Sequence, residues 1–254
     1  MKQLLSIARY TLIENVRNKI FYIIVLFGVI IVGASLLLSN LGSAQATRIL
    51  LDTGLVSIEF FTLISAIFAA VTLVLEEMES KTIYLILSRP VSRARYLTGR
   101  FMGMLAAVYC GMAIMALVHM AMLFFNHWEF TLRYPLALFL SAEKVAIMAA
   151  IALFFSLAST SAVTSISFTA FFWVLGHFSA EMRFIGEKAP NVLAKLFLKI
   201  VYYILPNFQY LNLRDFWDVP NITGVWVGAG AVYGLLYSML LIGLAVLYFK
   251  KKEF

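Results

Sequence analysis

The chain has 254 residues, of which 63% are hydrophobic and 13% are charged. Soluble domains are about half apolar and about a quarter charged, so this composition excludes an ordinary soluble protein and predicts an all-α polytopic membrane protein with a single membrane domain. The formal net charge of +7 is concentrated on one side of the predicted spans, as described below, and we expect no nucleic-acid partner.

The first 19 residues predict an amphipathic helix that lies in the membrane interface ahead of the first span. Its apolar face is formed by Leu4, Leu5, Ala8, Leu12 and Val16. The opposite face carries Lys2, Ser6, Arg9 and Arg17. This separation is typical of helices that rest on lipid. Two interpretations remain open: a surface anchor, or an elbow that transmits motion into the first span.

Six apolar runs are long enough to cross a bilayer, which takes roughly 20 helical residues. They cover residues 20–39, 54–75, 101–125, 141–159, 162–179 and 224–249. The fifth run is the shortest and contains several serines and threonines, whose hydroxyls are able to bond back to their own helix. We therefore expect six transmembrane helices.

Charge gives the orientation of these spans. If both termini lie on one side, that side carries twelve Lys and Arg residues and five acidic ones, whereas the other side carries eight of each. The whole positive excess then falls on one face, and the positive-inside rule places this face in the cytoplasm. We expect a multi-pass protein of a bacterial inner membrane with both termini and residues 76–100 cytoplasmic.

The longest segment on the predicted outer side is 180–223. Pro190, Pro206 and Pro220 divide it, which predicts several short helices or turns. Within it, apolar residues between 192 and 201 follow helical spacing and are interrupted by Lys195 and Lys199. We expect an amphipathic helix there that rests on the outer leaflet or re-enters it.

Residues 76–103 carry the clearest mechanistic pattern. A glutamate-rich turn at 76–79 ends the second span, and a short apolar patch follows at 83–87. Pro90 then breaks the helix because it lacks an N–H, and Ser92 is placed to cap a new helix that leads into the third span. An exposed apolar helix needs a cover. The cover is either the lipid headgroups or a soluble partner that docks on the patch.

The pattern in this segment resembles the cytoplasmic loop of type-2 ABC exporter permeases. The matching positions are Glu79, Lys81-Thr82, Leu87, Pro90-Val91-Ser92-Arg93, Tyr96-Leu97 and Gly99-Arg100. It is similar in particular to the six-span subfamily that includes the permease of the nitrous-oxide-reductase copper-maturation system. Leu205-Pro206-Asn207-Phe208 resembles that subfamily's segment ahead of the last span. Lys81, where many relatives carry Gly, favours this branch over the drug exporters.

The resemblance implies that residues 76–100 form a coupling helix, received by a groove on a separate cytoplasmic ATP-binding subunit, and that two copies of the chain form a dimer. It assigns the contact to Glu79, Thr82, Ile83, Leu85, Leu87, Pro90, Arg93, Gly99 and Arg100. The sequence contains no G-x-x-x-x-G-K-[ST] phosphate loop. We therefore expect no catalytic residue and no cofactor in this chain, with ATP and magnesium bound by the partner.

The use made of that ATP is open at this point. One hypothesis is export of an unidentified substrate by a permease. The second is a non-transporting scaffold that relays ATPase motion to a periplasmic partner through 180–223 during metalloenzyme maturation. An intramembrane enzyme is disfavoured, because His119 and His177 have no acidic neighbour at helical spacing and a buried, hydrogen-bonded histidine explains each.

Glu59 is the acidic residue placed deepest in a predicted span. An intramembrane carboxylate is a functional candidate, although one near the outer boundary would simply reach the headgroups. Both interpretations stay open. Glu143 and Lys144 begin the fourth span, where we expect them to snorkel or to pair at the interface.

One face of the third span is rich in thioethers. Met112, Met115, His119 and Met122 follow helical spacing and would suit Cu(I). Methionine also fills irregular gaps in ordinary packing, which is the favoured explanation, and we expect no resident metal site. In the last span, Gly224/Gly228 and Gly230/Gly234 are spaced for close helix packing.

Overall fold

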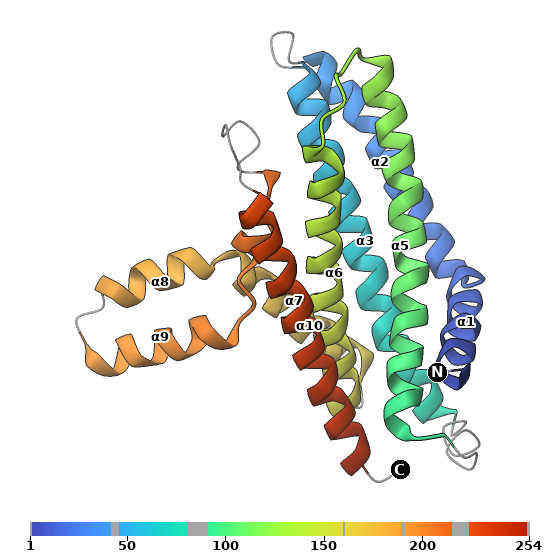
Figure 1. Ribbon diagram of the computed structural model, residues 1–254, viewed down its shortest axis with the longest axis vertical. Coiled ribbons are helices and arrows are strands. Elements are labelled where there is room, and N and C mark those ends of the chain that lie inside the picture. The colour runs from blue at the N-terminus through green and yellow to red at the C-terminus, as the bar shows by residue number, and fades with distance from the viewer. Residues whose placement is uncertain are drawn as a thin grey trace.

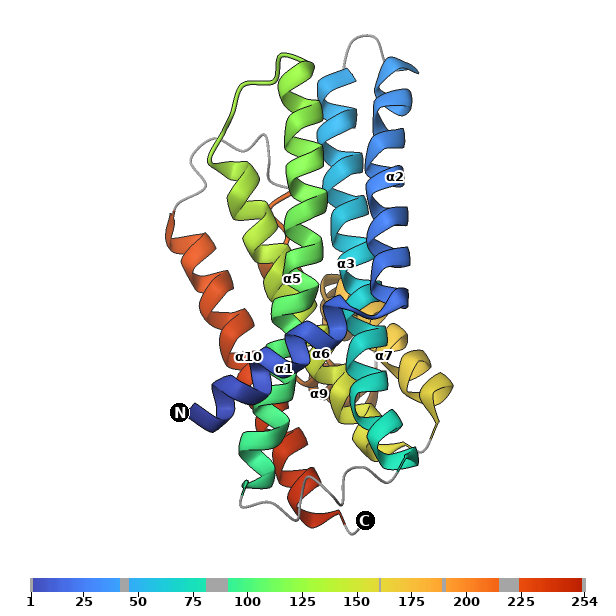
Figure 2. The same cartoon turned by 90° about the vertical axis from the view of Figure 1, so that its right-hand side faces the viewer.

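The computed structural model describes residues 2–41, 46–80, 91–159, 161–188, 191–214 and 224–252. Within these ranges the regular structure is entirely helical. Long helices run up and down to form a bundle, a short N-terminal helix lies across its lower part, and a helical hairpin projects from one side (Figures 1 and 2). The all-α expectation is confirmed for the described part of the chain.

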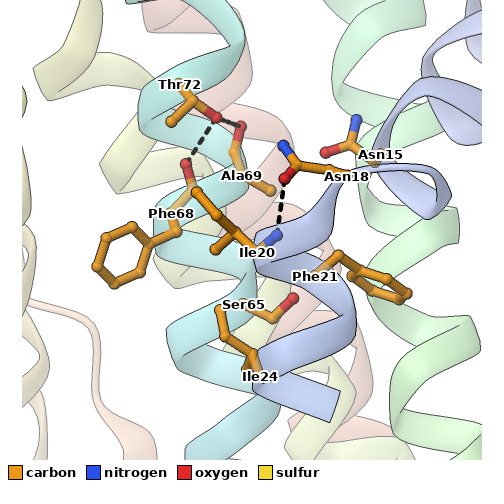
Figure 3. Close-up of a pocket in the computed structure, with 9 residues that line it drawn as sticks. All are labelled: Asn15, Asn18, Ile20, Phe21, Ile24, Ser65, Phe68, Ala69 and Thr72. Carbon is orange, nitrogen blue, oxygen red and sulfur yellow. Dashed lines mark hydrogen bonds between the residues drawn. The ribbon is translucent and has the colours of Figure 1, made fainter. Parts of the chain in front are cut away.

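The N-terminal helix α1 (Lys2–Val16) and the first long helix α2 (Lys19–Leu41) are separated by a sharp turn. The side chain of Asn18 accepts a hydrogen bond of 2.9 Å from the backbone N–H of Ile20, so it caps the start of α2 (Figure 3). Figure 2 shows α1 crossing the lower part of α5, whereas α2 runs along the bundle. The turn at residues 17–18 therefore changes the direction of the chain, so that α1 crosses α5 whereas α2 runs along the bundle.

Four further helices are long enough to cross a membrane. They are α3 (Ala46–Glu79), α5 (Arg93–Phe125), α6 (Arg133–Ala158) and α10 (Gly224–Lys251). Helices α3, α5 and α6 each begin eight residues before the corresponding apolar run. Polar residues do not end a helix as long as its backbone hydrogen bonds continue, so the helices extend past the apolar runs.

The fifth predicted span differs from the other five. Helix α7 (Ala162–His177) has 16 residues, or about 24 Å at the α-helical rise, and a 64° bend separates it from α8 (Ser179–Lys188). Five helices of the described chain are therefore long and apolar enough to span, and a sixth exists if the bent pair is counted as one. A straight continuation would have carried the charges of Glu181 and Arg183 along the span, which is costly in hydrocarbon.

The segment after the bend contains short helices, as its prolines predict. Helix α9 (Val192–Ile204) packs beside α8, and the two form the hairpin that projects from the bundle in Figure 1. A 3-10 turn, η1 (Phe208–Leu211), then returns the chain to α6 and α10. Residues 189–190 and 215–223 of this predicted loop lie outside the described residues.

Burial separates a central helix from peripheral ones. In the apolar part of α6, 78% of residues are buried within the chain, compared with 17% in α2 and 22% in α10. Helix α6 is therefore the core of the bundle, and α2 and α10 present apolar faces outward for lipid or a partner to cover. The start of α1 and the end of α10 lie toward the same end of the bundle (Figures 1 and 2).

Candidate functional site

Arg100 joins three helices near the start of α5. Its side chain is only 6% exposed, and its guanidinium forms ion pairs with Glu14 of α1 and Glu77 of α3. It also donates a hydrogen bond of 3.3 Å to the hydroxyl of Thr11, and the hydroxyl of Tyr96 donates to Glu77. We refer to these five residues as the Arg100 cluster. A buried guanidinium with two carboxylate partners fixes the relative positions of α1, α3 and α5.

The two carboxylates of the cluster have different surroundings. The side chain of Glu14 is 47% exposed, whereas that of Glu77 is 13% exposed. Burial raises the pKa of Glu77, and the adjacent Arg100 guanidinium acts in the opposite direction. The charge of Glu77 therefore depends on Arg100, and this pair is the part of the cluster most sensitive to substitution.

Two glycines allow α1 to lie directly against α5. A Cβ added at Gly99 would come 3.1 Å from the carbonyl oxygen of Leu4, and one at Gly103 would overlap the carbonyl oxygen of Ala8. The two glycines are one helical turn apart, so the backbones cross in close contact in the manner of a G-x-x-x-G motif. Gly103 was not among the predicted site residues, although its spacing from Gly99 is visible in the sequence.

We predict that Gly103→Ala displaces α1 from α5, because the added methyl group would overlap the backbone carbonyl oxygen of Ala8. The expected loss is about 1–3 kcal/mol of stability, as for overpacked sites in general, and it is measured as a lower melting temperature in detergent. Gly33→Ala in α2 is the matched control, since nothing lies within 4 Å of its added Cβ. An equal loss in both variants would contradict the crossing.

Arg93 ties the start of α5 to the end of α10. Its Nη1 donates hydrogen bonds to the carbonyl oxygens of Phe249, Lys250 and Lys252, at 3.2, 3.1 and 2.9 Å. A cation at this position satisfies carbonyls that a helix C-terminus leaves unpaired. Lys252 in turn donates a bond of 2.6 Å to the carbonyl of Leu157 near the end of α6. Helices α1, α3, α5, α6 and α10 are thus connected by polar contacts at one end of the bundle.

Two cavities lie where α1 turns into α2 and faces α3. One, of about 20 Å³, is lined by Asn15, Asn18, Ser65 and Thr72 among others (Figure 3). The other, of about 320 Å³, reaches the Arg100 cluster and is lined by Glu14, Glu77 and Arg100 together with neighbouring polar groups. The side of α1 that faces α3 is therefore not closely packed, in contrast to the side that crosses α5.

The predicted coupling residues fall into two groups. Thr82, Ile83, Leu85, Leu87 and Pro90 lie outside the described residues, and Glu79 ends α3 with a side chain that is not described. Arg93, Gly99 and Arg100 are described, and each holds another helix against α5. Contact with an ATP-binding subunit remains a prediction for all of these residues. The sequence does not reveal that Arg100 pairs with Glu14 and Glu77, which are 86 and 23 positions away.

A second cluster of charges lies inside the bundle. Oε1 of Glu59 in α3 is 2.9 Å from Nζ of Lys144 in α6, and its Oε2 accepts a hydrogen bond of 2.6 Å from Ser141. Arg214, which follows η1, lies 3.8 Å from the same carboxylate. We refer to these four residues as the Glu59 cluster. Because Glu59 is buried and paired, the interpretation in which it reaches the headgroups is wrong.

Glu143 and Lys144 meet their expectation only in part, since Lys144 forms an ion pair. Neither snorkels, because α6 begins at Arg133 and both positions lie buried within the bundle. Lys144 pairs with Glu59, whereas Oε2 of Glu143 has no hydrogen-bond partner in the described part of the chain. Glu143 packs against α10, where a Cβ at Gly234 would come 2.9 Å from it. Gly234 therefore permits close packing, as its spacing from Gly230 predicts.

Gly230 shows the same behaviour one turn away. A Cβ added there would overlap the carbonyl oxygen of Tyr210, so α10 lies directly on the segment around η1. Gly224 and Gly228 have nothing within 4 Å, and their predicted role in close packing finds no contact within the chain. One of the two spaced glycine pairs in α10 thus serves helix packing inside this chain.

The methionine-rich face of α5 is packed inside the bundle. Met112 and Met115 are buried with Val32 and Ile58, and Met122 packs against the same cluster. His119 lies 3.1 Å from the hydroxyl of Tyr134 and 3.2 Å from the carbonyl oxygen of Leu50, so both ring nitrogens have partners. A buried, hydrogen-bonded histidine is confirmed. The metal path through these residues remains a prediction, and the described side chains contain no group of three His, Cys, Asp or Glu positioned to hold a metal.

Asn207, in the segment Leu205-Pro206-Asn207-Phe208, holds the base of the hairpin together. Its Oδ1 accepts hydrogen bonds from Ser179 of α8 and from the backbone of Gln209, at 2.9 and 3.0 Å. Its backbone N–H donates a bond of 2.7 Å to the hydroxyl of Tyr233 in α10. The side chain of Asn207 thus links α8 to η1, and its backbone N–H links the same segment to α10.

Comparison with known proteins assigns the chain as a whole. A family model described as "ABC-2 family transporter protein" matches residues 5–254, which is nearly the entire length. No curated protein shows significant similarity to the chain. The match extends over the Arg100 cluster, the Glu59 cluster and the hairpin, so all three features belong to one family domain.

Proposed function

Because the chain belongs to the ABC-2 family of transporter proteins, we propose that it is a permease subunit that couples ATP hydrolysis in a separate cytoplasmic subunit to export of a substrate across a bacterial inner membrane. The sequence has no phosphate loop, so ATP and magnesium are bound by the partner. In this proposal the chain has six spans, both termini are cytoplasmic, and the permease works as a dimer.

The observation that supports coupling is the Arg100 cluster. Residues 81–90, which carry most of the predicted docking positions, lie between the end of α3 and the start of α5. Glu77 and Arg100 link these two helices to each other, and Glu14 adds α1. Arg93 adds α10. A force applied by an ATPase at 81–90 would therefore reach four helices together, with α1 acting as an elbow.

Dimerisation is supported by the surfaces that the single chain leaves open. The apolar parts of α2 and α10 are mostly unburied within the chain. Lipid covers part of this surface, and a second copy of the chain covers the rest. The resemblance of residues 79–100, and Lys81 in particular, favours the copper-enzyme maturation branch of the family as a proposal, without identifying the exported compound.

The docking claim is tested by co-purification with an ATP-binding subunit encoded nearby. Leu85→Asp combined with Leu87→Asp is expected to abolish association, because charge replaces the apolar patch that would enter the partner's groove. The matched control is Gln3→Asp combined with Ser6→Asp, which adds the same charge at exposed positions of α1. Undiminished association of the Leu85 and Leu87 variant would contradict coupling through this segment.

A further inference from the structure

A cavity of about 440 Å³, open on one side, lies between α8 and α9 of the hairpin and has no role in the proposed coupling. It is lined from α8 by Arg183 and Glu187, from α9 by Lys195, Lys199 and Tyr202, and from η1 by Tyr210. Figure 1 shows the two helices side by side, projecting away from the bundle. A cavity of this volume is in the range of sites for small ligands.

The two faces of α9 have opposite chemistry. One face, which includes Val192, Leu196, Phe197 and Ile200, is exposed and apolar, and no residue of α9 is buried within the chain. The other face carries Lys195 and Lys199 toward α8, with Leu198 packed on Gly186. A helix of this type lies in a membrane interface with its apolar side in the acyl region. In that orientation the cavity would lie at the level of the lipid headgroups.

The charges around the cavity are strongly unbalanced. Three cations, Arg183, Lys195 and Lys199, line it with a single acid, Glu187. Nε of Arg183 is 3.0 Å from Oε1 of Glu187, so that pair is neutral overall. In the described part of the chain neither lysine has an ion pair or a hydrogen bond from its side chain. Two like charges one helical turn apart therefore face the same space, and the one acid among the described lining residues is already paired with Arg183.

We propose that the α8–α9 cavity binds a phosphate-bearing anion, with Lys195 and Lys199 as its charge partners. A phosphate supplies the missing negative charge, and lysine binds it as a point charge. Tyr202 and Tyr210 also line the cavity, and their hydroxyls are able to hydrogen-bond phosphate or a polyol attached to it, although the hydroxyl of Tyr202 already accepts a bond of 3.3 Å from Asn207. The same chemistry occurs in an anionic phospholipid headgroup and in a soluble phosphate ester.

The test measures binding to the full-length chain purified in detergent. Phosphatidylglycerol and phosphatidylcholine with identical acyl chains are titrated, and bound lipid is counted by native mass spectrometry. Wild type is expected to prefer phosphatidylglycerol. Lys195→Gln combined with Lys199→Gln is expected to weaken phosphatidylglycerol binding about 10- to 30-fold, since each cation near an anionic headgroup contributes about 1 kcal/mol.

The matched control is Lys188→Gln combined with Lys2→Gln, which removes the same charge outside the cavity and should keep the preference. Competition by glycerol phosphate or inorganic phosphate would support the site and identify a soluble phosphate compound as its ligand. Binding of phosphatidylglycerol without competition would support it and identify the lipid. Wild-type affinity in the Lys195 and Lys199 variant, an equal loss in the control, or no binding of any of these probes would overturn the proposal.

Discussion

Arg100→Gln is expected to lower the free energy of unfolding by about 3–5 kcal/mol, the usual cost of removing one partner of a buried ion pair. The guanidinium is 6% exposed and holds two carboxylates from different helices. Without it, Glu77 remains buried near Glu14, and both carboxylates lose the cation with which they are paired. The change is measured as a shift in reversible unfolding in detergent, and as faster proteolysis of α1.

Two further variants distinguish the loss of the Arg100 ion pairs from a general sensitivity of α5 to substitution. Arg95→Gln changes the same residue type one turn earlier on the same helix, where the side chain is exposed, and its effect should stay within about 0.5 kcal/mol. Adding Glu77→Gln to Arg100→Gln removes the buried carboxylate and should recover much of the loss. If the two arginine variants were equally destabilised, the Arg100 cluster would not be what holds α1 in place.

The sequence predicts the long helices well and the contacts between them poorly. Apolar length and composition identify α2, α3, α5, α6 and α10, because spanning a bilayer demands about 20 apolar residues whatever their neighbours are. Pairing of Arg100 with Glu14 joins residues 86 positions apart, and pairing of Lys144 with Glu59 joins residues 85 apart. Such pairs depend on the rotation and register of packed helices, which periodicity in a single segment does not specify.

Helix α1 shows this limit in detail. The helical wheel places Leu5 on a face expected to rest on lipid, and Leu5 is 60% exposed within the chain, which agrees with that expectation. The wheel does not predict that Thr11 is buried at the crossing of α1 with α5, because that contact depends on Gly99 and Gly103 of the other helix. The predicted end of the fifth span at residue 179 lies close to the observed end of α7 at His177, but the packing of Phe208 on Gly176 beside the bend is again a contact between distant segments that the sequence does not reveal.

Glu59→Gln and Glu143→Gln make the same chemical change at two buried positions and are expected to have different outcomes. Loss of the Glu59 carboxylate leaves Lys144, which is 3% exposed, without its partner, at a cost of about 3–5 kcal/mol. Oε2 of Glu143 has no hydrogen-bond partner among the described residues. An amide of the same shape at position 143 therefore loses no ion pair, and stability should be unchanged or higher.

The comparison is made by unfolding both variants in the same detergent, together with Glu59→Gln combined with Lys144→Met. That double variant removes both charges and should lie closer to wild type than Glu59→Gln alone, because an uncompensated buried ammonium costs more than the loss of the pair. The Glu59 cluster joins α3, α6 and the segment after η1. A large loss of stability in Glu59→Gln with none in Glu143→Gln would show that the Glu59 cluster holds the segment after η1 against the core. Equal losses of stability would contradict this role.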